Sequence, residues 1–235
     1  MNKLKIFIKS RLPFLVYPLR WLSYSLRYGF GGSADKIFVR KYDKKGGLGG
    51  RESRSGPGSD LAETEVVRQI LPVLIKELNI QSLLDIPCGD FYWMKLVEMD
   101  IDYIGGEIVP SLVEEDKKLY GNDKRQFVCL DIIKDKLPKT DMVLCRDCLF
   151  YLSNADVLDS FRNIKKSGAE YLLMTHFPEK TVNENIPTGS WRPINFELPP
   201  FNLPKPIRIF DEKCPVAGFH DKSLGLWKVS EIPDF

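Results

Sequence analysis

Three acidic residues stand at the ends of three successive apolar segments of this 235-residue chain. Asp85 lies in the first segment, Glu107 follows about 20 positions later near the end of the second, and Asp131 comes directly after the third. In an open, parallel α/β sheet, ligands bind beyond the carboxyl ends of the strands. If the three segments are neighbouring strands, their carboxylates therefore face one small molecule.

The loop with the sequence DIPCGD at 85–90 indicates which small molecule that is. It lacks the G-x-G-x-x-G pattern that brings the pyrophosphate of a dinucleotide to a helix N-terminus. Asp85 and Asp90 flank the turn, and two carboxylates repel a pyrophosphate but attract the sulfonium and ammonium groups of S-adenosylmethionine. Gly89 lets the backbone pass close to a ligand. The charges favour S-adenosylmethionine over NAD as the cofactor.

The second and third acids have natural partners on the same cofactor. Glu107 is placed to accept hydrogen bonds from both ribose hydroxyls, and Asp131 to accept one from the adenine amino group. Each acid alone is equally compatible with a strand-end cap or a turn, so their occurrence at three successive strand ends is what indicates a site. The predicted cofactor-binding residues are Asp85, Pro87, Cys88, Gly89, Asp90, Trp93, Glu107, Ile108, Asp131, Ile132 and Arg146.

The elements that position these residues alternate along the chain. An amphipathic helix is expected to begin at Ser59 or Asp60 and to reach Leu78, with a kink at Pro72. Helical stretches are also expected at about 91–98, 110–119 and 154–166. The expected strands are Ser82–Pro87, Tyr103–Val109, Phe127–Leu130, Met142–Cys145 and Tyr171–Thr175, with Ile207–Phe210 and Leu224–Val229 as an antiparallel pair at one edge.

This alternation predicts the fold class. Short, nearly continuous apolar strands separated by helices are typical of a parallel sheet that is covered on both faces. We therefore predict an α/β, Rossmann-like, doubly wound, mostly parallel seven-stranded sheet with helices on both faces.

The loop at 85–90, Glu107 and Asp131 together resemble motifs one to three of class I S-adenosylmethionine-dependent methyltransferases. The resemblance extends over about residues 60–176 and implies an enzyme that transfers a methyl group. It departs from the family in one respect. The further glycines of the usual G-x-G-x-G loop are missing, and Asp90 is followed by the aromatic sequence FYW.

A narrower resemblance joins segments 50–59, 90–94, 146–153 and 189–195 to a bacterial methyltransferase group. Members of this group often accompany genes for surface-polysaccharide synthesis. The resemblance implies a sugar hydroxyl, in a saccharide or glycolipid precursor, as the methyl acceptor, which is an inference by association.

Methyl transfer to a hydroxyl requires positioning and a base beside the methyl group. Asp147, just past the fourth expected strand, and His176, at the end of the fifth, are the predicted catalytic residues. A proline-rich and aromatic stretch follows and is expected to fold over the same end of the sheet. Tyr151, Trp191 and Arg192 are the predicted acceptor-binding residues. A structural role, as a cap or as loop packing, is an open alternative for each of these residues.

Composition limits the other classes of function. A formal net charge of +2 argues against a nucleic-acid binder that relies on a global basic field. Five cysteines, an odd number, indicate reduced thiols and a cytoplasmic chain. Cys145 and Cys148 form half of a zinc motif that has no second half, so no metal is predicted.

The N-terminal part divides into two segments by composition. Residues 1–32 form an extension whose first 30 residues are basic and aromatic with no acid. They suit either an interfacial helix on the inner face of an anionic membrane or a helix packed on the domain. Residues 33–58 are rich in Gly, Ser and Arg and are expected to be a linker or a lid, followed by the methyltransferase domain at 59–235.

Three other interpretations stay open. In the first, the enzyme methylates another small molecule or a protein side chain. In the second, the chain is an inactive membrane-associated scaffold that kept the fold. In the third, it is a nicotinamide-dependent oxidoreductase. Retention of all three acids disfavours the scaffold, and Asp90 with the missing glycine pattern disfavours the oxidoreductase.

Overall fold

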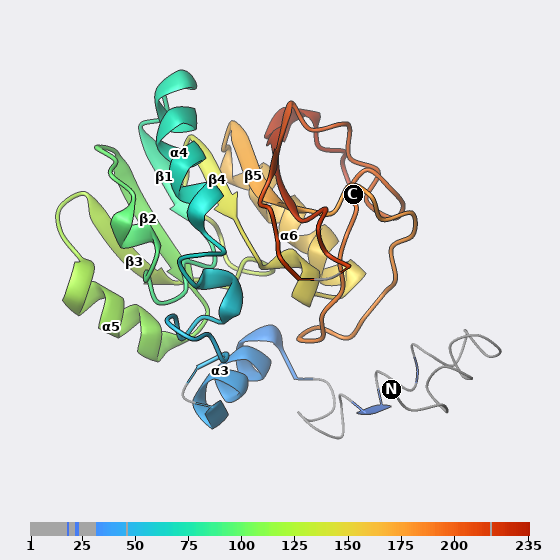
Figure 1. Cartoon of the computed structure of the whole chain (residues 1–235), viewed down its shortest axis with the longest axis horizontal. Coiled ribbons are helices and arrows are strands. Elements are labelled where there is room, and N and C mark those ends of the chain that lie inside the picture. Colours follow the sequence, from blue (N-terminus) through green and yellow to red (C-terminus); the bar gives the residue numbers. More distant parts are fainter. Residues whose placement is uncertain (1–17, 19–21, 24–31, 46, 217) are drawn as a thin grey trace.

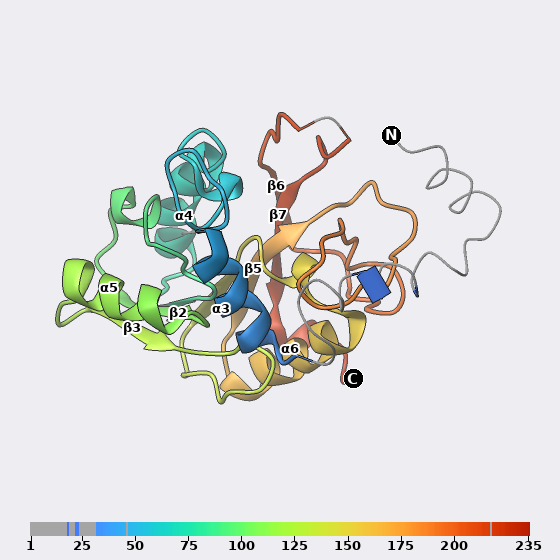
Figure 2. The same cartoon turned by 90° about the horizontal axis from the view of Figure 1, so that it is seen from below.

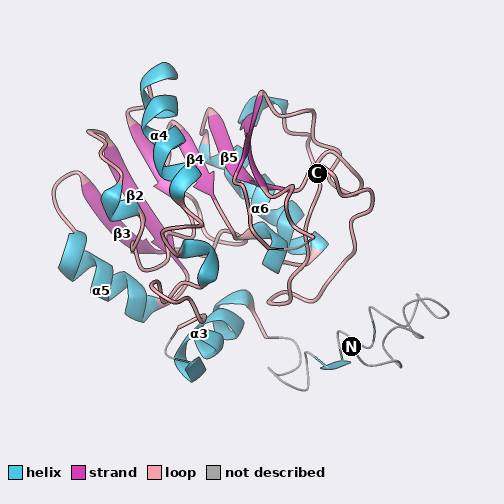
Figure 3. Ribbon diagram, viewed as in Figure 1, coloured by secondary structure: helices cyan, strands magenta, loops and turns pink. Residues whose placement is uncertain are grey.

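A computed structural model describes residues 32–45, 47–216 and 218–235, together with 18, 22 and 23. The strands are β1 (Ser82–Asp85), β2 (Asp102–Glu107), β3 (Arg125–Cys129), β4 (Met142–Cys145), β5 (Tyr171–His176), β6 (Arg208–Asp211) and β7 (Ser223–Lys228). The helices named below are α3 (Ala34–Lys45), α4 (Glu65–Glu77), α5 (Pro110–Tyr120) and α6 (Asn154–Ser167). Figures 1 and 3 show these elements as one sheet with helices around it.

The seven strands form a single sheet in the order β3-β2-β1-β4-β5-β7-β6. Strands β1 to β5 run parallel, whereas β7 is antiparallel to both of its neighbours, β5 and β6. The predicted Rossmann-like, mostly parallel sheet is therefore confirmed, including the antiparallel pair at one edge. The point where the strand order reverses lies between β1 and β4, which is where open α/β sheets bind ligands.

Alternate residues of each central strand pack into two different cores. Leu83 of β1 belongs to the core that α4 covers, and its neighbour Leu84 belongs to the core that α6 covers. Figure 2 shows α4 and α6 on opposite faces of the sheet. Because side chains of a strand point alternately to the two faces, a strand buried on both sides must be apolar throughout.

The register of the sheet brings the three acids together. Asp85 pairs with Gly105, two positions before Glu107, and Glu107 pairs with Cys129, two positions before Asp131. Each successive acid therefore lies slightly beyond the end of its neighbour's strand. All three stand at the carboxyl edge of the parallel strands.

Two helices differ from the expectation. Helix α4 begins at Glu65 rather than at Ser59 or Asp60, because the Asp60 carboxylate accepts hydrogen bonds from the backbone amides of residues 51–53 instead of capping a helix. The stretch expected to be helical at 91–98 forms only a 3₁₀ turn, Met94–Leu96. Phe91 there has a left-handed φ of 53°, and burial of Phe91, Trp93 and Met94 does not suit the single apolar stripe of a surface helix.

The segment 33–58 contains helix α3 and a loop that packs on the domain. In Figure 1, α3 lies below the sheet, at the end toward which the parallel strands point. The prediction of a membrane-surface helix concerns residues 1–32, nearly all of which lie outside the described residues. Within the described part of the chain, no helix has the length and apolar character needed to cross a bilayer.

Candidate active site

A cavity of about 590 Å³ lies at the carboxyl ends of β1 to β4, between the sheet, α3 and the loop at 55–59. All the predicted cofactor-binding residues except Asp90 line this cavity. They are Asp85, Pro87, Cys88, Gly89, Trp93, Glu107, Ile108, Asp131, Ile132 and Arg146. Of the predicted acceptor-side residues, Asp147 and Tyr151 also line it. The size is typical of a cavity for a cofactor-sized ligand.

Asp85 ends β1 and is almost fully buried, with 2% of its surface exposed. Its carboxylate accepts a hydrogen bond from the Tyr103 hydroxyl at 2.8 Å. Burial raises the pKa of Asp85 to about 7, and Glu107 adds to the rise, while Tyr103 and Arg146 oppose it. A carboxyl group in this state favours a ligand that brings a positive charge.

Glu107 is held rigidly at the end of β2. One carboxylate oxygen accepts hydrogen bonds from the backbone amides of Ile108 at 2.8 Å and Val109 at 3.1 Å, and the other accepts from the amide of Gly89 at 3.2 Å. Burial raises the pKa of Glu107, while these backbone donors oppose the rise. The carboxylate thus also joins the loop after β1 to the end of β2.

Asp131 is buried and lies one residue beyond the apolar segment that includes β3. Its carboxylate accepts a hydrogen bond from the amide of Ile133 at 2.9 Å and lies 3.3 Å from the ammonium of Lys134. It therefore caps the following turn and lines the cavity at the same time. A role as a turn cap and a place in the wall of the cavity, the two alternatives for this residue, are therefore compatible.

The absence of a side chain at Gly89 allows a close contact with Ser55 that the sequence does not predict. The φ of Gly89 is +62°, and a Cβ atom placed on it would lie 2.3 Å from the hydroxyl oxygen of Ser55. The backbone at this turn is approached by the N-terminal loop. A side chain at position 89 would push that loop away from the cavity wall.

Asp90 is corrected from a predicted cofactor ligand to an anchor for the N-terminal loop. Its carboxylate accepts hydrogen bonds from the Ser53 hydroxyl at 2.8 Å, the Arg54 amide at 2.7 Å and the Ser55 hydroxyl at 3.2 Å. The Ser55 hydroxyl also accepts from the Asp90 amide at 2.7 Å. The carboxylate is therefore turned toward this loop and does not line the cavity.

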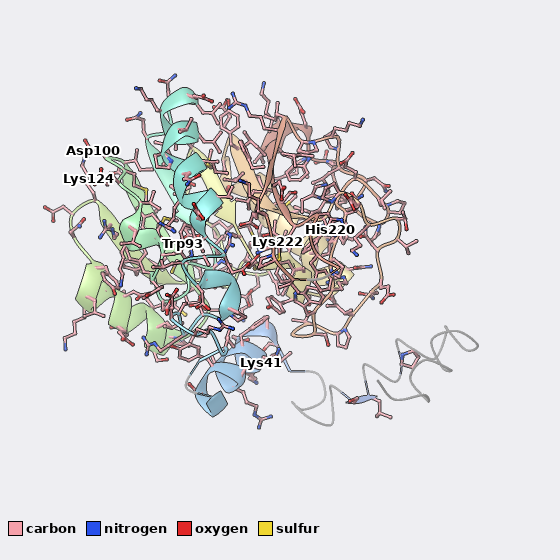
Figure 4. All side chains as sticks on the ribbon, in the orientation of Figure 1. Lys41, Trp93, Asp100, Lys124, His220 and Lys222 are labelled. Carbon is pink, nitrogen blue, oxygen red and sulfur yellow. The ribbon has the colours of Figure 1, made fainter. Side chains whose placement is uncertain are left out.

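A buried group of alternating charges lies beyond β4. Arg146 donates to Glu212 at 2.6 Å and to the backbone carbonyls of Gly58 at 2.7 Å and Glu63 at 2.9 Å. The Lys222 ammonium lies 2.9 Å from Asp147 and 3.3 Å from Glu212. Figure 4 shows Lys222 close to the centre of the molecule. This group fixes both the end of β4 and the loop that precedes α4.

Asp147 occupies a constrained position in this group. Its backbone has a left-handed φ of 53°, and its carboxylate accepts a hydrogen bond from the Thr175 hydroxyl at 3.1 Å. Burial would raise the pKa of Asp147, but Arg146 and Lys222 together outweigh burial and hold the pKa below its usual value. Asp147 is therefore an ionised hydrogen-bond acceptor at the cavity wall at neutral pH.

His176 is corrected from a predicted catalytic base to a core residue. It is completely buried and is absent from the cavity wall. Its Nδ1 atom accepts a hydrogen bond from the Phe196 amide at 3.3 Å, and its ring packs edge-on against Trp227. Burial lowers its pKa, although Glu197 opposes this. The ring therefore lies outside the wall of the described cavity.

The predicted acceptor-binding residues separate into two groups. Tyr151 lines the cavity and meets the ring of Phe38 edge-on. Trp191 packs edge-on against Phe219, outside the cavity. Arg192 is buried and donates to the backbone carbonyl of Leu152 at 2.6 Å, so it fastens the proline-rich loop instead of facing an acceptor.

Two sets of residues at the site are missed by sequence reasoning. The first is the N-terminal wall, formed by α3 and the loop at 55–59. Figure 4 shows Lys41 on α3, and its ammonium donates to the Gly189 carbonyl. The second set is Glu212 and Lys222, at the ends of β6 and β7. For the first set, the sequence signals are the composition of 33–58, which predicts a linker or a lid, and the resemblance carried by segment 50–59. Glu212 and Lys222 have no local signal, because they enter through contacts between distant segments.

No protein-family model and no curated protein sequence matches the chain. Among solved structures, human N-acetylserotonin methyltransferase in complex with SAM aligns with 94% of this chain and 68% of that one, at a TM-score of 0.55 and 11% identity. The methyltransferase domain of bacterial CtHen1 aligns with 70% of this chain and 98% of that one, at a TM-score of 0.52 and 9% identity.

The cyclase SpnF also aligns, with 71% of this chain and 70% of that one, at a TM-score of 0.50 and 15% identity. At these identities the likeness concerns the fold alone, and SpnF is named for a reaction other than methyl transfer. The chain therefore has the Rossmann-like fold that class I S-adenosylmethionine-dependent methyltransferases share.

Proposed function

We propose that this chain is an S-adenosylmethionine-dependent methyltransferase. The observation that carries the proposal is the convergence of Asp85, Glu107 and Asp131 on one cavity at the switch point of a methyltransferase-type sheet. A site with three buried carboxylates suits a cofactor that is cationic at one end and rich in hydrogen-bond donors at the other. It repels the pyrophosphate of a nicotinamide dinucleotide.

The residues present fit the parts of S-adenosylmethionine in turn. Asp85 attracts the cationic methionine end, Glu107 accepts hydrogen bonds from the ribose hydroxyls, and Asp131 accepts one from the adenine amino group. Ile108 and Ile132 offer apolar walls beside these acids. When bound, the cofactor supplies a methyl group on a sulfonium, which is open to attack by a nucleophile.

On the acceptor side, Asp147 orients the attacking hydroxyl by accepting its hydrogen bond. Because Arg146 and Lys222 hold the pKa of Asp147 low, this carboxylate stays ionised and serves as an acceptor over a broad range of pH. A hydroxyl becomes strongly acidic as its oxygen gains a methyl group, so even a weakly basic carboxylate can take the proton at that stage. Most of the catalytic effect then comes from positioning.

The proposed acceptor is a hydroxyl of a saccharide or glycolipid precursor. Its support is the resemblance of the segments at 50–59, 90–94, 146–153 and 189–195 to a bacterial group associated with surface polysaccharides. Three of these segments carry residues that line the cavity. These residues are Ser55 to Ser59, Trp93, Arg146, Asp147, Cys148, Tyr151 and Leu152. A cytoplasmic enzyme that approaches the inner membrane surface through residues 1–30 is consistent with this acceptor.

Calorimetric titration of the full chain with S-adenosylhomocysteine tests the cofactor, with NAD as the control ligand. We expect micromolar binding of S-adenosylhomocysteine alone. Glu107→Gln is expected to weaken binding by about ten- to a hundred-fold, because one partner of charge-assisted hydrogen bonds is lost. A folded protein that binds neither ligand would overturn the proposal.

The acceptor is tested separately, with S-adenosylmethionine that carries a radioactive methyl group. Incubation with nucleotide sugars, glycolipid fractions, peptides and small hydroxylated metabolites shows which class receives the label. Transfer into the carbohydrate-containing fractions supports the saccharide acceptor. Transfer only into peptides or other small molecules supports the alternative acceptors, and cofactor binding without any transfer supports the inactive scaffold.

A further inference from the structure

Helix α3 crosses the open end of the sheet and belongs to the wall of the cavity, although it precedes the Rossmann-like unit. Figure 2 shows α3 lying over the ends of the strands. Ala34, Phe38, Lys41 and Tyr42 of this helix line the cavity. The helix is held on one side by the edge-on contact of Phe38 with Tyr151, and on the other side by Tyr42.

Tyr42 packs where the adenosine end of a ligand would lie. It forms a small apolar cluster with Val109 and Leu112, and Val39 and Ile108 pack against that cluster. Val109 and Ile108 directly follow Glu107, whose carboxylate is the proposed partner of the ribose hydroxyls. Because the purine is bonded to the ribose, a cofactor whose ribose hydroxyls meet Glu107 would carry its purine close to this cluster.

The ring of Tyr42 is available to such a ligand, but its hydroxyl is not. The residue lines the cavity, whereas its hydroxyl oxygen is buried and has no hydrogen-bond partner among the described residues. The charged groups that act on this side chain are Arg54, Asp90, Glu115 and Asp116. The hydroxyl therefore points toward the protein, and contact with a ligand is left to the ring.

We propose that the ring of Tyr42 forms part of the wall of the adenine pocket, on the side where Ile108 packs against the same cluster. A flat aromatic ring packs on a purine through dispersion and offset stacking. The N-terminal segment thus supplies a cofactor-binding residue that no strand-end motif contains. The inference rests on the proposed S-adenosylmethionine site and assigns its purine subsite to α3.

Four variants of the full chain separate ring contact from helix packing. Tyr42→Ala removes the ring, Tyr42→Leu keeps apolar packing without an aromatic face, and Tyr42→Phe removes only the hydroxyl. Val39→Ala is the matched control, since Val39 lies on the same helix and packs against the same cluster but does not line the cavity. Circular dichroism and thermal unfolding establish that each variant is folded.

Each variant is titrated with two probes, S-adenosylhomocysteine and 5′-deoxy-5′-methylthioadenosine, which keeps the purine and ribose but lacks the amino-acid end. Tyr42→Ala and Tyr42→Leu are expected to weaken both probes by about five- to ten-fold. Tyr42→Phe and Val39→Ala are expected to stay within about two-fold of the wild type. If Tyr42→Ala does not fold, the affinity of Tyr42→Leu for the two probes decides whether the ring contacts the ligand.

Three results would overturn the inference. Wild-type affinity in both Tyr42→Ala and Tyr42→Leu would remove the ring from the site. An equal loss in Val39→Ala would assign the effect to helix packing. A loss for S-adenosylhomocysteine without a loss for methylthioadenosine would place Tyr42 at the amino-acid end. Failure of the wild-type protein to bind either probe would instead overturn the proposed cofactor.

Discussion

The carboxylate of Asp147 and the ammonium of Lys222 lie 2.9 Å apart, although Asp147 follows β4 and Lys222 precedes β7, with β5 between these strands. Lys222 also approaches Glu212, which in turn accepts a hydrogen bond from Arg146. The edge pair β6 and β7 therefore reaches the wall of the candidate active site. This relationship predicts a role for the last third of the chain in setting the charge of Asp147.

Replacing Lys222 by Gln is expected to raise the pKa of Asp147, because one of the two cations that stabilise its ionised form is removed. Titration of the Asp147 carboxyl carbon by NMR measures this shift. Lys222→Arg keeps the charge and is the matched control. An unchanged pKa in Lys222→Gln would mean that Arg146 alone sets it.

The same substitution has a consequence for stability. The pKa of Asp147 is lower in the folded state than in the unfolded state, so its stabilisation is present above about pH 4 and is lost as pH falls through the folded-state pKa. Lys222→Gln breaks a buried pair and is expected to reduce the free energy of unfolding by about 3 kcal/mol at pH 7. The difference from wild type should shrink in acid, as denaturant titrations at pH 7 and pH 3.5 will show.

Cofactor binding is expected to depend on pH through Asp85. Its pKa is raised to about 7 by burial, and a cationic ligand binds better when this carboxyl is ionised. Affinity for S-adenosylmethionine should therefore rise by up to about ten-fold between pH 6 and pH 8, with release of a proton on binding below pH 7. Calorimetry in two buffers of different ionisation enthalpy measures that proton. In Asp85→Asn, binding should be weaker and should not change between pH 6 and pH 7, below the range where the α-amino group of the ligand titrates. A pH dependence that persists there would assign the titration to another group.

Loss of the Asp90 carboxylate is expected to release the loop that it anchors. Asp90→Ala removes the acceptor of the Ser53 and Ser55 hydroxyls and of the Arg54 amide, a loss of about 2 kcal/mol of local stability. Trypsin should then cleave faster after Arg51 and Arg54, as mass spectrometry of the fragments will reveal. Asp102→Ala, at an exposed aspartate of β2, serves as the control, and equal cleavage in both variants would contradict the anchoring role.

His176→Leu is expected to keep wild-type affinity for S-adenosylhomocysteine, because His176 is outside the cavity. Burial lowers its pKa, so the unfolded state takes up a proton first and wild-type stability falls as pH drops below about 6.5. The variant should lack this contribution, which denaturant unfolding at pH 7.5 and pH 5.5 will detect. A large loss of ligand affinity in a folded variant would mean that His176 contributes to ligand binding.

Much of the fold and part of the site follow from local sequence pattern. The strands, their mostly parallel direction and the three acids could be predicted because apolar runs set which segments are buried on both faces. The chain leaves such a strand at its carboxyl end, where ligands bind. Asp85, Glu107 and Asp131 depend only on that local placement, and the structure brings them to one cavity as expected.

Tertiary structure decided the residues whose roles depend on distant partners. Asp90 lies in the loop after β1 and His176 ends β5, as expected. The direction of the Asp90 side chain is set by its contact with Ser53, and that of His176 by its contact with Phe196. No local pattern encodes these contacts. Tyr42 and Lys222 reach the site from opposite ends of the chain. Propensity and periodicity describe neighbours in sequence, whereas burial of a charge or a ring requires a partner that only the folded chain supplies.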